Sequence, residues 1–185
     1  FFGNNSRYGY LYFDSTDQLH WYSGEYTTGA SATLNSELTT TAVYRDPSSW
    51  YHILFVYDTT EATSTDRIKL FVNGTQVTTF STASYPALNS ESFVNSNLLH
   101  CIGVFGTIAV YFYNGYMTEI NFVDGQALTP SDFGGNNPTT GVWEPLPYIG
   151  TYGTNGFYLN FSDNSGTTSA TLGADSSGNV NNWTP

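Results

Sequence analysis

An Asn-Gly pair between two runs of alternating apolar residues is the feature that most constrains how this chain folds. It lies in the segment DRIKLFVNGTQVTTF, residues 66–80. The Ile, Leu and Val side chains of 68–72 alternate along the chain, so they point to one side of an extended strand. Asn73 and Gly74 tolerate the positive φ that a two-residue hairpin turn requires. The sequence therefore predicts a β-hairpin whose second strand runs back over 75–80.

Strand-forming runs recur along the rest of the chain, each bounded by Gly, Asn, Asp or Pro. The turn-rich DSTD at 14–17 joins two of them into a further hairpin. The run at 49–58 is apolar on both faces, which predicts a central strand covered on both sides. The predicted strands lie within residues 8–13, 18–22, 49–58, 98–105, 108–125 and 156–163.

Helical periodicity is nearly absent, and only TPSDFG at 129–134 predicts a short helical turn, with Thr129 as its N-cap. Antiparallel strands without helices predict an all-β fold, either a two-sheet sandwich or a barrel. We assign residues 1–163 to this domain. Residues 164–185 are rich in Ser, Gly and Asn, and we expect them to be irregular, packing on the domain or leading to a linker. Since the chain starts at Phe1 and not at Met, we expect a segment of a longer protein.

Charged residues are scarce, at 10% of the chain, and most of them are acidic. Four Lys and Arg against fifteen Asp and Glu give a net charge of -11, which would repel a phosphate backbone and excludes nucleic acid as a partner. No run approaches the roughly 20 apolar residues of a membrane-spanning helix, so membrane insertion is not expected. The lone cysteine, Cys101, is predicted to be a small buried residue on a strand.

Three segments stand out in order along the chain: WYHILFVYD at 50–58, RIKLFVNG at 67–74 and NGYMTEINFVDGQAL at 114–128. Together they resemble the concanavalin A-like lectin/glucanase superfamily in its laminin-G and pentraxin-like branch. The resemblance implies a jelly-roll sandwich of two antiparallel sheets. Domains of this family usually begin with a strand of the form S-x-T-F-S-x-W-V. Nothing like it precedes Phe1, so an early strand of one sheet is expected to be missing or supplied from elsewhere.

Further segments look like the version of this domain found in virion proteins of tailed phages. They are RDPSSWYH at 45–52, FVDGQALTPSDFG at 122–134 and YGTNGFYLNFSDNSG at 152–166. This resemblance implies a place on a tail fibre or capsid appendage, and therefore a location on the surface of an extracellular particle. It also implies other virion proteins and host cell-surface polysaccharide as partners, and a homo-oligomer.

Glucanases with this fold place two Glu around an Asp as E-x-D-x-x-E, because a nucleophile and a general acid must stand about 5 Å apart in one groove. Glu119 is followed by INFVD, so the pattern fails, and the sequence predicts no catalytic residues and no enzyme. We interpret His20, His52 and His100 as buried, hydrogen-bonded structural residues.

Oxygen-rich stretches at 14–17, 162–166 and 175–179 raise the question of a calcium site. None matches the EF-hand loop, and turn formation alone accounts for Asp, Asn, Ser and Gly at such places. We therefore predict no cofactor and no metal ligands, and keep calcium as the alternative.

Two predicted strands each carry a stripe of tyrosines opposite an apolar stripe. In one sheet the tyrosines would form a wet aromatic platform on which sugar rings could lie, while the apolar stripe would face the core. A contact with another subunit or plain packing would also explain the tyrosines. The ligand-binding candidates are Tyr8, Tyr10, Tyr12, Tyr111 and Tyr113, and the expected core residues are Leu11, Phe13, Val110 and Phe112.

We therefore expect a non-enzymatic virion appendage domain that binds host-surface glycans. The single contacts would be weak and made effective by several copies on one particle. The alternative is a purely structural virion protein, such as a decoration, cement or fibre-shaft domain, with its tyrosine stripes buried. An endoglycanase stands third, only because the fold hosts such enzymes.

Overall fold

The computed structural model of the chain describes residues 2–3, 7–25, 33–106 and 111–185. Contacts between residues divide the chain into two compact units, each of which is described by itself. The first unit comprises Phe1–Tyr113 and Ala127–Pro147, and the second comprises Asn114–Gln126 and Tyr148–Pro185.

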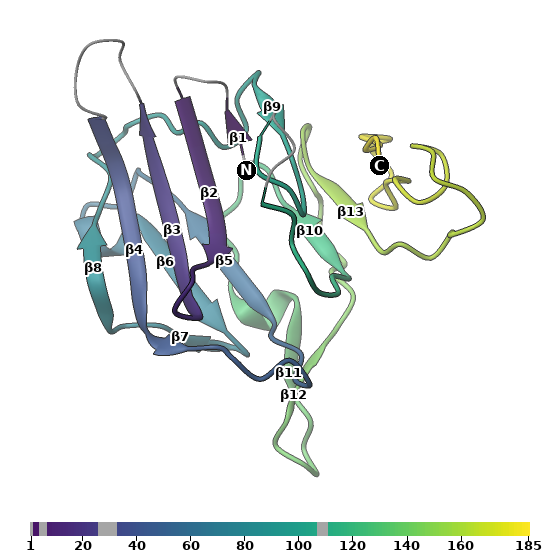
Figure 1. Cartoon of the computed structure of the whole chain (residues 1–185), viewed down its shortest axis with the longest axis horizontal. Coiled ribbons are helices and arrows are strands. Elements are labelled where there is room, and N and C mark those ends of the chain that lie inside the picture. Colours follow the sequence, from purple (N-terminus) through teal and green to yellow (C-terminus); the bar gives the residue numbers. More distant parts are fainter. Residues whose placement is uncertain (1, 4–6, 26–32, 107–110) are drawn as a thin grey trace. The chain divides into compact units, whose positions relative to one another are not determined.

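A six-stranded antiparallel sheet forms one layer of the first unit, in the order β8-β4-β3-β2-β1-β9 (Figure 1). The predicted hairpin around residues 14–17 is confirmed, because β2 and β3 pair with each other on either side of this turn. The side chain of Asp14 closes the turn by accepting the backbone N–H of Thr16 at 2.8 Å. The strands are β1 (Phe2–Gly3), β2 (Arg7–Phe13), β3 (Gln18–Glu25), β4 (Thr33–Val43), β8 (Phe80–Ser84) and β9 (Leu99–His100).

A three-stranded sheet forms the second layer, in the order β5-β6-β7. The predicted hairpin turn is confirmed at Asn73 and Gly74, whose φ angles are 48° and 76°. The returning strand is shorter than predicted, because the chain leaves this sheet after residue 76 and then pairs with β4 as β8. The strands are β5 (Ile53–Tyr57), β6 (Ile68–Val72) and β7 (Thr75–Gln76).

The core of the first unit lies between these two sheets. Trp21 of β3 is only 1% exposed, and its ring lies 4.3 Å from that of Phe55 on β5. Its Nε1–H donates to Ser36 Oγ at 2.9 Å. Leu38 of β4 and Ile68 of β6 complete the buried cluster. Two antiparallel sheets facing each other over an apolar core confirm the predicted all-β sandwich.

The prediction of a central, covered strand at 49–58 is wrong. β5 lies at the edge of its sheet, and its residues are all half-buried. Phe55 and Tyr57 pack on Trp21 across the sandwich. An apolar run indicates which faces of a strand are covered, but not how many neighbouring strands pair with it. Periodicity therefore could not distinguish an edge strand from a central strand.

Two short 3-10 helices and a small hairpin complete the described part of the first unit. The helical turn predicted at 129–134 is confirmed, and Asp132 Oδ2 accepts the backbone N–H of Thr129 at 2.8 Å. The elements are η1 (Ser64–Asp66), η2 (Pro130–Asp132), β11 (Gly134–Asn136) and β12 (Trp143–Pro145).

The second unit contains one antiparallel pair, β10 (Ile120–Phe122) with β13 (Phe157–Leu159). Residues 164–185 form no helix or strand. They pack on β13, because Asp175 accepts the backbone N–H of Tyr158 at 2.8 Å and the Trp183 ring lies 4.9 Å from that of Phe157. The domain limit at residue 163 stays a prediction.

Three predicted strands are much shorter than expected. Within 98–105, 108–125 and 156–163, the described residues form strands only at β9, β10 and β13. Tyr111 has a φ of 55°, a left-handed conformation that breaks the alternation of an extended strand. Phe112 is 69% exposed and does not face the core, and Val110 lies outside the described residues.

Cys101 follows β9 directly and is half-buried, so the prediction of a buried residue on a strand is wrong. The apolar run around it belongs mostly to a loop. Among the residues that the structure describes, no helix has both the length and the apolar character needed to cross a membrane.

Candidate functional site

The tyrosines of β2 lie on the side of the six-stranded sheet that faces away from Trp21. Leu11, between two of them, packs on the Trp21 cluster, and alternate side chains of a strand point to opposite faces. The predicted alternation along β2 is therefore confirmed for Leu11. Register extends the tyrosine side across the sheet, to β3 and then to β4. We define the aromatic face as Tyr8, Tyr10, Tyr12, His20, Tyr22 and Glu37.

The tyrosine rings of the aromatic face stack against one another. The Tyr22 ring lies 5.8 Å from that of Tyr8 and 5.5 Å from that of Tyr10, with interplanar angles of 14° and 17°. Nearly parallel rings at these separations are offset stacks. The ring faces therefore partly cover one another. A ligand on this face would meet ring edges and hydroxyl groups.

Tyr111 reaches the aromatic face through an intermediate ring. Phe105 packs edge-on against Tyr10 at 5.3 Å between ring centroids, and Tyr111 packs edge-on against Phe105 at 6.0 Å. Tyr111 is 83% exposed and does not lie on a strand, and Tyr113 is also exposed. The predicted second tyrosine strand is therefore wrong, although Tyr111 lies next to the cluster.

A chain of hydrogen bonds crosses three strands of the aromatic face. Tyr12 Oη lies 2.8 Å from His20 Nδ1, and His20 Nε2 lies 3.0 Å from Glu37 Oε1. These residues come from β2, β3 and β4. Tyr12 lies directly opposite His20, and Glu37 is the diagonal neighbour of His20, because its direct partner is Tyr22. His20 is hydrogen-bonded, as predicted, but it lies on the face opposite the Trp21 core.

The phenols of Tyr10, Tyr12 and Tyr22 have raised pKa values and stay protonated above the ordinary range of tyrosine. Burial, followed by the neighbouring Tyr12, Tyr8 and Tyr22, raises the pKa of Tyr10. Burial also raises the pKa of Tyr12 and of Tyr22, with smaller contributions from Asp14 and Tyr8 respectively. Each protonated phenol can both donate and accept a hydrogen bond.

We expect the free energy of unfolding to fall as the pH rises above about 10, the ordinary pKa of tyrosine. The raised pKa values mean that the folded chain holds these protons more tightly than the unfolded chain. This stabilisation is fully present below the unfolded pKa and is lost as the pH rises through the folded pKa. Denaturant unfolding at a series of pH values measures it. The loss should be less steep in Tyr10→Phe, and an equally steep loss would contradict a contribution from Tyr10.

Glu37 is the only carboxylate that the described strands of the six-stranded sheet place on the aromatic face. The other acidic residue of these strands, Glu25, belongs to the opposite face, where Oε1 accepts Arg7 Nε–H at 2.9 Å. The cations of the chain are all engaged elsewhere. Three form ion pairs, namely Arg7–Glu25, Arg45–Asp17 and Lys69–Asp66, and the Arg67 guanidinium donates to backbone carbonyl groups.

The first 134 residues of the chain match a known protein family. A laminin-G-type family model, described as the concanavalin A-like lectin/glucanases superfamily, matches residues 1–134. The chain belongs to this superfamily. The matched residues include the six-stranded and the three-stranded sheet of the first unit and the whole aromatic face. Searches among curated proteins and among solved structures gave no significant match.

The concanavalin A-like superfamily contains both glycanases and non-enzymatic lectin-like domains. In this concanavalin A-like domain, sequence reasoning missed Tyr22 and Glu37 and did not place His20 at the site. His20 and Tyr22 alternate with apolar Leu19 and Trp21, the same signal that identified the tyrosines of β2. Glu37 gave no such signal, because its Ser- and Thr-rich strand was not predicted.

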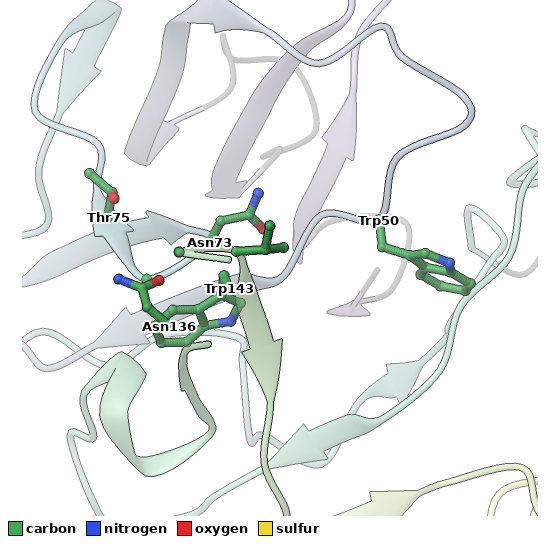
Figure 2. A pocket seen from close by; sticks show the side chains of 8 residues that line it. Trp50, Asn73, Thr75, Asn136 and Trp143 are labelled. Atoms are coloured by element: carbon green, nitrogen blue, oxygen red, sulfur yellow. The ribbon is translucent and has the colours of Figure 1, made fainter. Parts of the chain in front are cut away.

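A pocket of 470 Å³ lies beside the Asn-Gly turn of this concanavalin A-like domain. Figure 2 shows Asn73, Asn136 and Trp143 close together, with Trp50 on the other side. Trp143 Nε1 and His52 Nδ1 are buried without a hydrogen-bond partner, and their rings lie 5.4 Å apart. His52 was predicted to be a buried, hydrogen-bonded structural residue, and its Nδ1 atom does not make such a hydrogen bond. Burial lowers the pKa of His52, which favours the neutral imidazole.

We expect Gly74→Ala to lower the free energy of unfolding by about 1–3 kcal/mol, because Gly74 has a φ of 76°. A Cβ atom there would also overlap the Trp143 ring. Gly141→Ala is the matched control, since Gly141 has a φ of 71° but open space around a Cβ atom. Denaturant unfolding of both variants separates backbone strain from overlap. Equal losses would show that the Trp143 contact is unimportant.

No group of three or more His, Cys, Asp or Glu side chains suited to a metal ion occurs in the described ranges. The oxygen-rich stretches use their carboxylates for their own backbone. Asp14 Oδ1 accepts N–H groups of Thr16 and Gln18, and Asp175 Oδ1 accepts those of Tyr158 and Ser177. The carboxylate oxygens that could bind a metal ion at these turns are therefore largely occupied by backbone N–H groups.

Proposed function

We propose that this domain binds carbohydrate on its aromatic face and performs no reaction on it. The observation that carries the proposal is the row of stacked tyrosines, with His20 and Glu37, on the side of the sheet away from the core. Tyrosine edges and hydroxyl groups offer both apolar contact and hydrogen bonds, which suits a sugar. Membership of a superfamily rich in lectin-like domains supports this reading.

The arrangement of carboxylates favours binding over hydrolysis. Glycosidases commonly need two carboxyl groups on either side of the scissile bond. Among the residues of the described strands, Glu37 is the only carboxylate on the aromatic face, and it is already hydrogen-bonded to His20. We therefore propose that the domain binds its ligand. A single carboxylate on this face disfavours the alternative function, an endoglycanase.

The proposed setting is a virion appendage, such as a tail fibre or capsid fibre, on the surface of an extracellular particle. It rests on the resemblance of residues 45–52, 122–134 and 152–166 to domains of tailed phages. Other virion proteins and host-surface polysaccharide would be the partners, and a homo-oligomer would supply the copies. Weak sites then gain from an effective concentration in the millimolar range. A structural domain with this face against a neighbouring subunit is the alternative.

The experiment that tests the proposal is a glycan array and host-cell binding assay with the domain displayed in many copies. Specific binding to at least one class of glycan is the expected result. A folded, multivalent sample that binds no glycan and no cell would contradict the proposal. The structural alternative would then be favoured, and it predicts that the aromatic face is buried in the assembled particle.

Removal of metal ions is expected to leave glycan binding unchanged. The carboxylates of the oxygen-rich turns already accept backbone N–H groups, so we propose that no calcium ion holds the sugar. Binding to the array is measured in EDTA and again after calcium is added. A tenfold or larger loss in EDTA that calcium restores would contradict this prediction, since about 1.4 kcal/mol of binding free energy would depend on the metal.

A further inference from the structure

Glu37 fixes the direction of the hydrogen bonds along the aromatic face. A carboxylate can only accept hydrogen bonds, and a neutral imidazole has one donor and one acceptor nitrogen. When the His20 ring is neutral, Nε2 therefore carries the proton that it donates to Glu37 Oε1. Nδ1 is then the acceptor, and Tyr12 donates its O–H to it.

At the corner of the face formed by Tyr12, His20 and Glu37, the neutral ring leaves acceptors, and not donors, for a ligand. The Tyr12 proton is used by His20, so Tyr12 Oη presents lone pairs. Glu37 Oε2 has no hydrogen-bond partner among the described residues, and the Glu37 side chain is partly exposed. This corner of the face therefore requires a ligand group that donates hydrogen bonds, as a sugar hydroxyl does.

Among the residues that the structure describes, no Lys or Arg side chain forms an ion pair with Glu37. The four Lys and Arg side chains all have other partners, and the whole chain carries a net charge of -11. A carboxylate or sulfate on a glycan is ionised at neutral pH and presents only acceptors. Such an acidic group placed against Glu37 would be repelled by the like charge and would form no hydrogen bond with the carboxylate. This arrangement disfavours acidic glycans as ligands.

We propose that the aromatic face selects neutral, hydroxyl-rich glycans against sialylated, uronic-acid or sulfated ones, and that Glu37 is the residue that determines this selectivity. The inference rests on the proposed carbohydrate binding and adds the class of ligand. Tyr12 and His20 act as positioning residues, because their hydrogen bonds hold the Glu37 carboxylate in place.

The test is an array of matched glycan pairs that differ only in one sialic acid or sulfate group. We expect the wild-type domain to bind the neutral member at least about tenfold more tightly, since a rejected group at a polar site costs on the order of that factor or more. Glu37→Gln supplies an N–H donor and removes the charge, so the preference should shrink about tenfold. Thermal unfolding checks that this nearly isosteric variant is folded.

Glu25→Gln is the matched control, because it makes the same change of charge on the opposite face of the same sheet. Its preference for neutral glycans should equal that of the wild type. If Glu25→Gln and Glu37→Gln relax the preference equally, total charge and not Glu37 sets it, and the inference is overturned. If the wild-type domain binds the acidic glycans with the same affinity as the neutral ones, the inference is also overturned. The proposed function would still stand in that case. Only failure to bind every glycan would overturn both.

Discussion

Replacing Trp21 by Ala is expected to lower the free energy of unfolding by about 3–5 kcal/mol, the usual cost of deleting a buried Trp side chain. Trp21 is 1% exposed and packs between the two sheets against Phe55. Its loss also removes the hydrogen bond to Ser36. Because domains are stable by only about 5–15 kcal/mol, this variant should be marginally folded at best. Denaturant unfolding followed by circular dichroism measures the change.

Trp50→Ala is the control for this prediction. The Trp50 side chain is 65% exposed, so its loss should change the free energy of unfolding by no more than about 0.5 kcal/mol. Similar losses in the two variants would contradict the position of the core between the sheets. The Trp21 variant should also lose any glycan binding, since Trp21 lies between His20 and Tyr22 on the strand that supports the aromatic face.

Replacing Tyr10 by Ala is expected to weaken glycan binding by about tenfold or more, because central aromatic residues dominate the energy of binding surfaces. The Tyr10 ring contacts those of Tyr8, Tyr12, Tyr22 and Phe105. Its removal would disorganise the whole stack. Tyr111→Ala should weaken binding less, since Tyr111 reaches Tyr10 only through Phe105.

Tyr116→Ala is the control for the Tyr10 variant, because Tyr116 is also a surface tyrosine but belongs to the second unit. It should bind glycans as the wild type does. Affinities are measured on monomeric and multivalent samples, since multivalency would enlarge the loss in Tyr10→Ala. Unchanged binding by a folded Tyr10→Ala domain would move the glycan site away from this face.

Local patterns predicted the parts of the fold that depend on neighbouring residues. The Asn73-Gly74 turn, the hairpin around Asp14 and the helical turn after Thr129 all follow from the chemistry of a few adjacent side chains. The crossing from β7 to β8 could not be predicted, because it depends on pairing with the distant β4. β4 itself was missed, since Ser and Thr made this β-branched strand look like a loop.

The candidate site was predicted only along one strand. Alternation placed Tyr8, Tyr10 and Tyr12 together, because it requires no knowledge of which strands pair. Tyr22, His20 and Glu37 join them through cross-strand register, and register is a property of the folded sheet. The opposite error concerns 111–113, where a positive φ at Tyr111 turned an alternating sequence into an exposed loop.

Chemical-shift mapping by nuclear magnetic resonance, with a glycan selected on the array, would test the central claim most directly. The account predicts that the largest shifts occur at Tyr8, Tyr10, Tyr22 and Glu37. The Trp50 and Trp143 indole signals, at the pocket beside the Asn-Gly turn, should stay unchanged. Shifts centred on that pocket, with none on β2 to β4, would contradict the account. They would show that the sugar binds among the amide and indole side chains of the pocket.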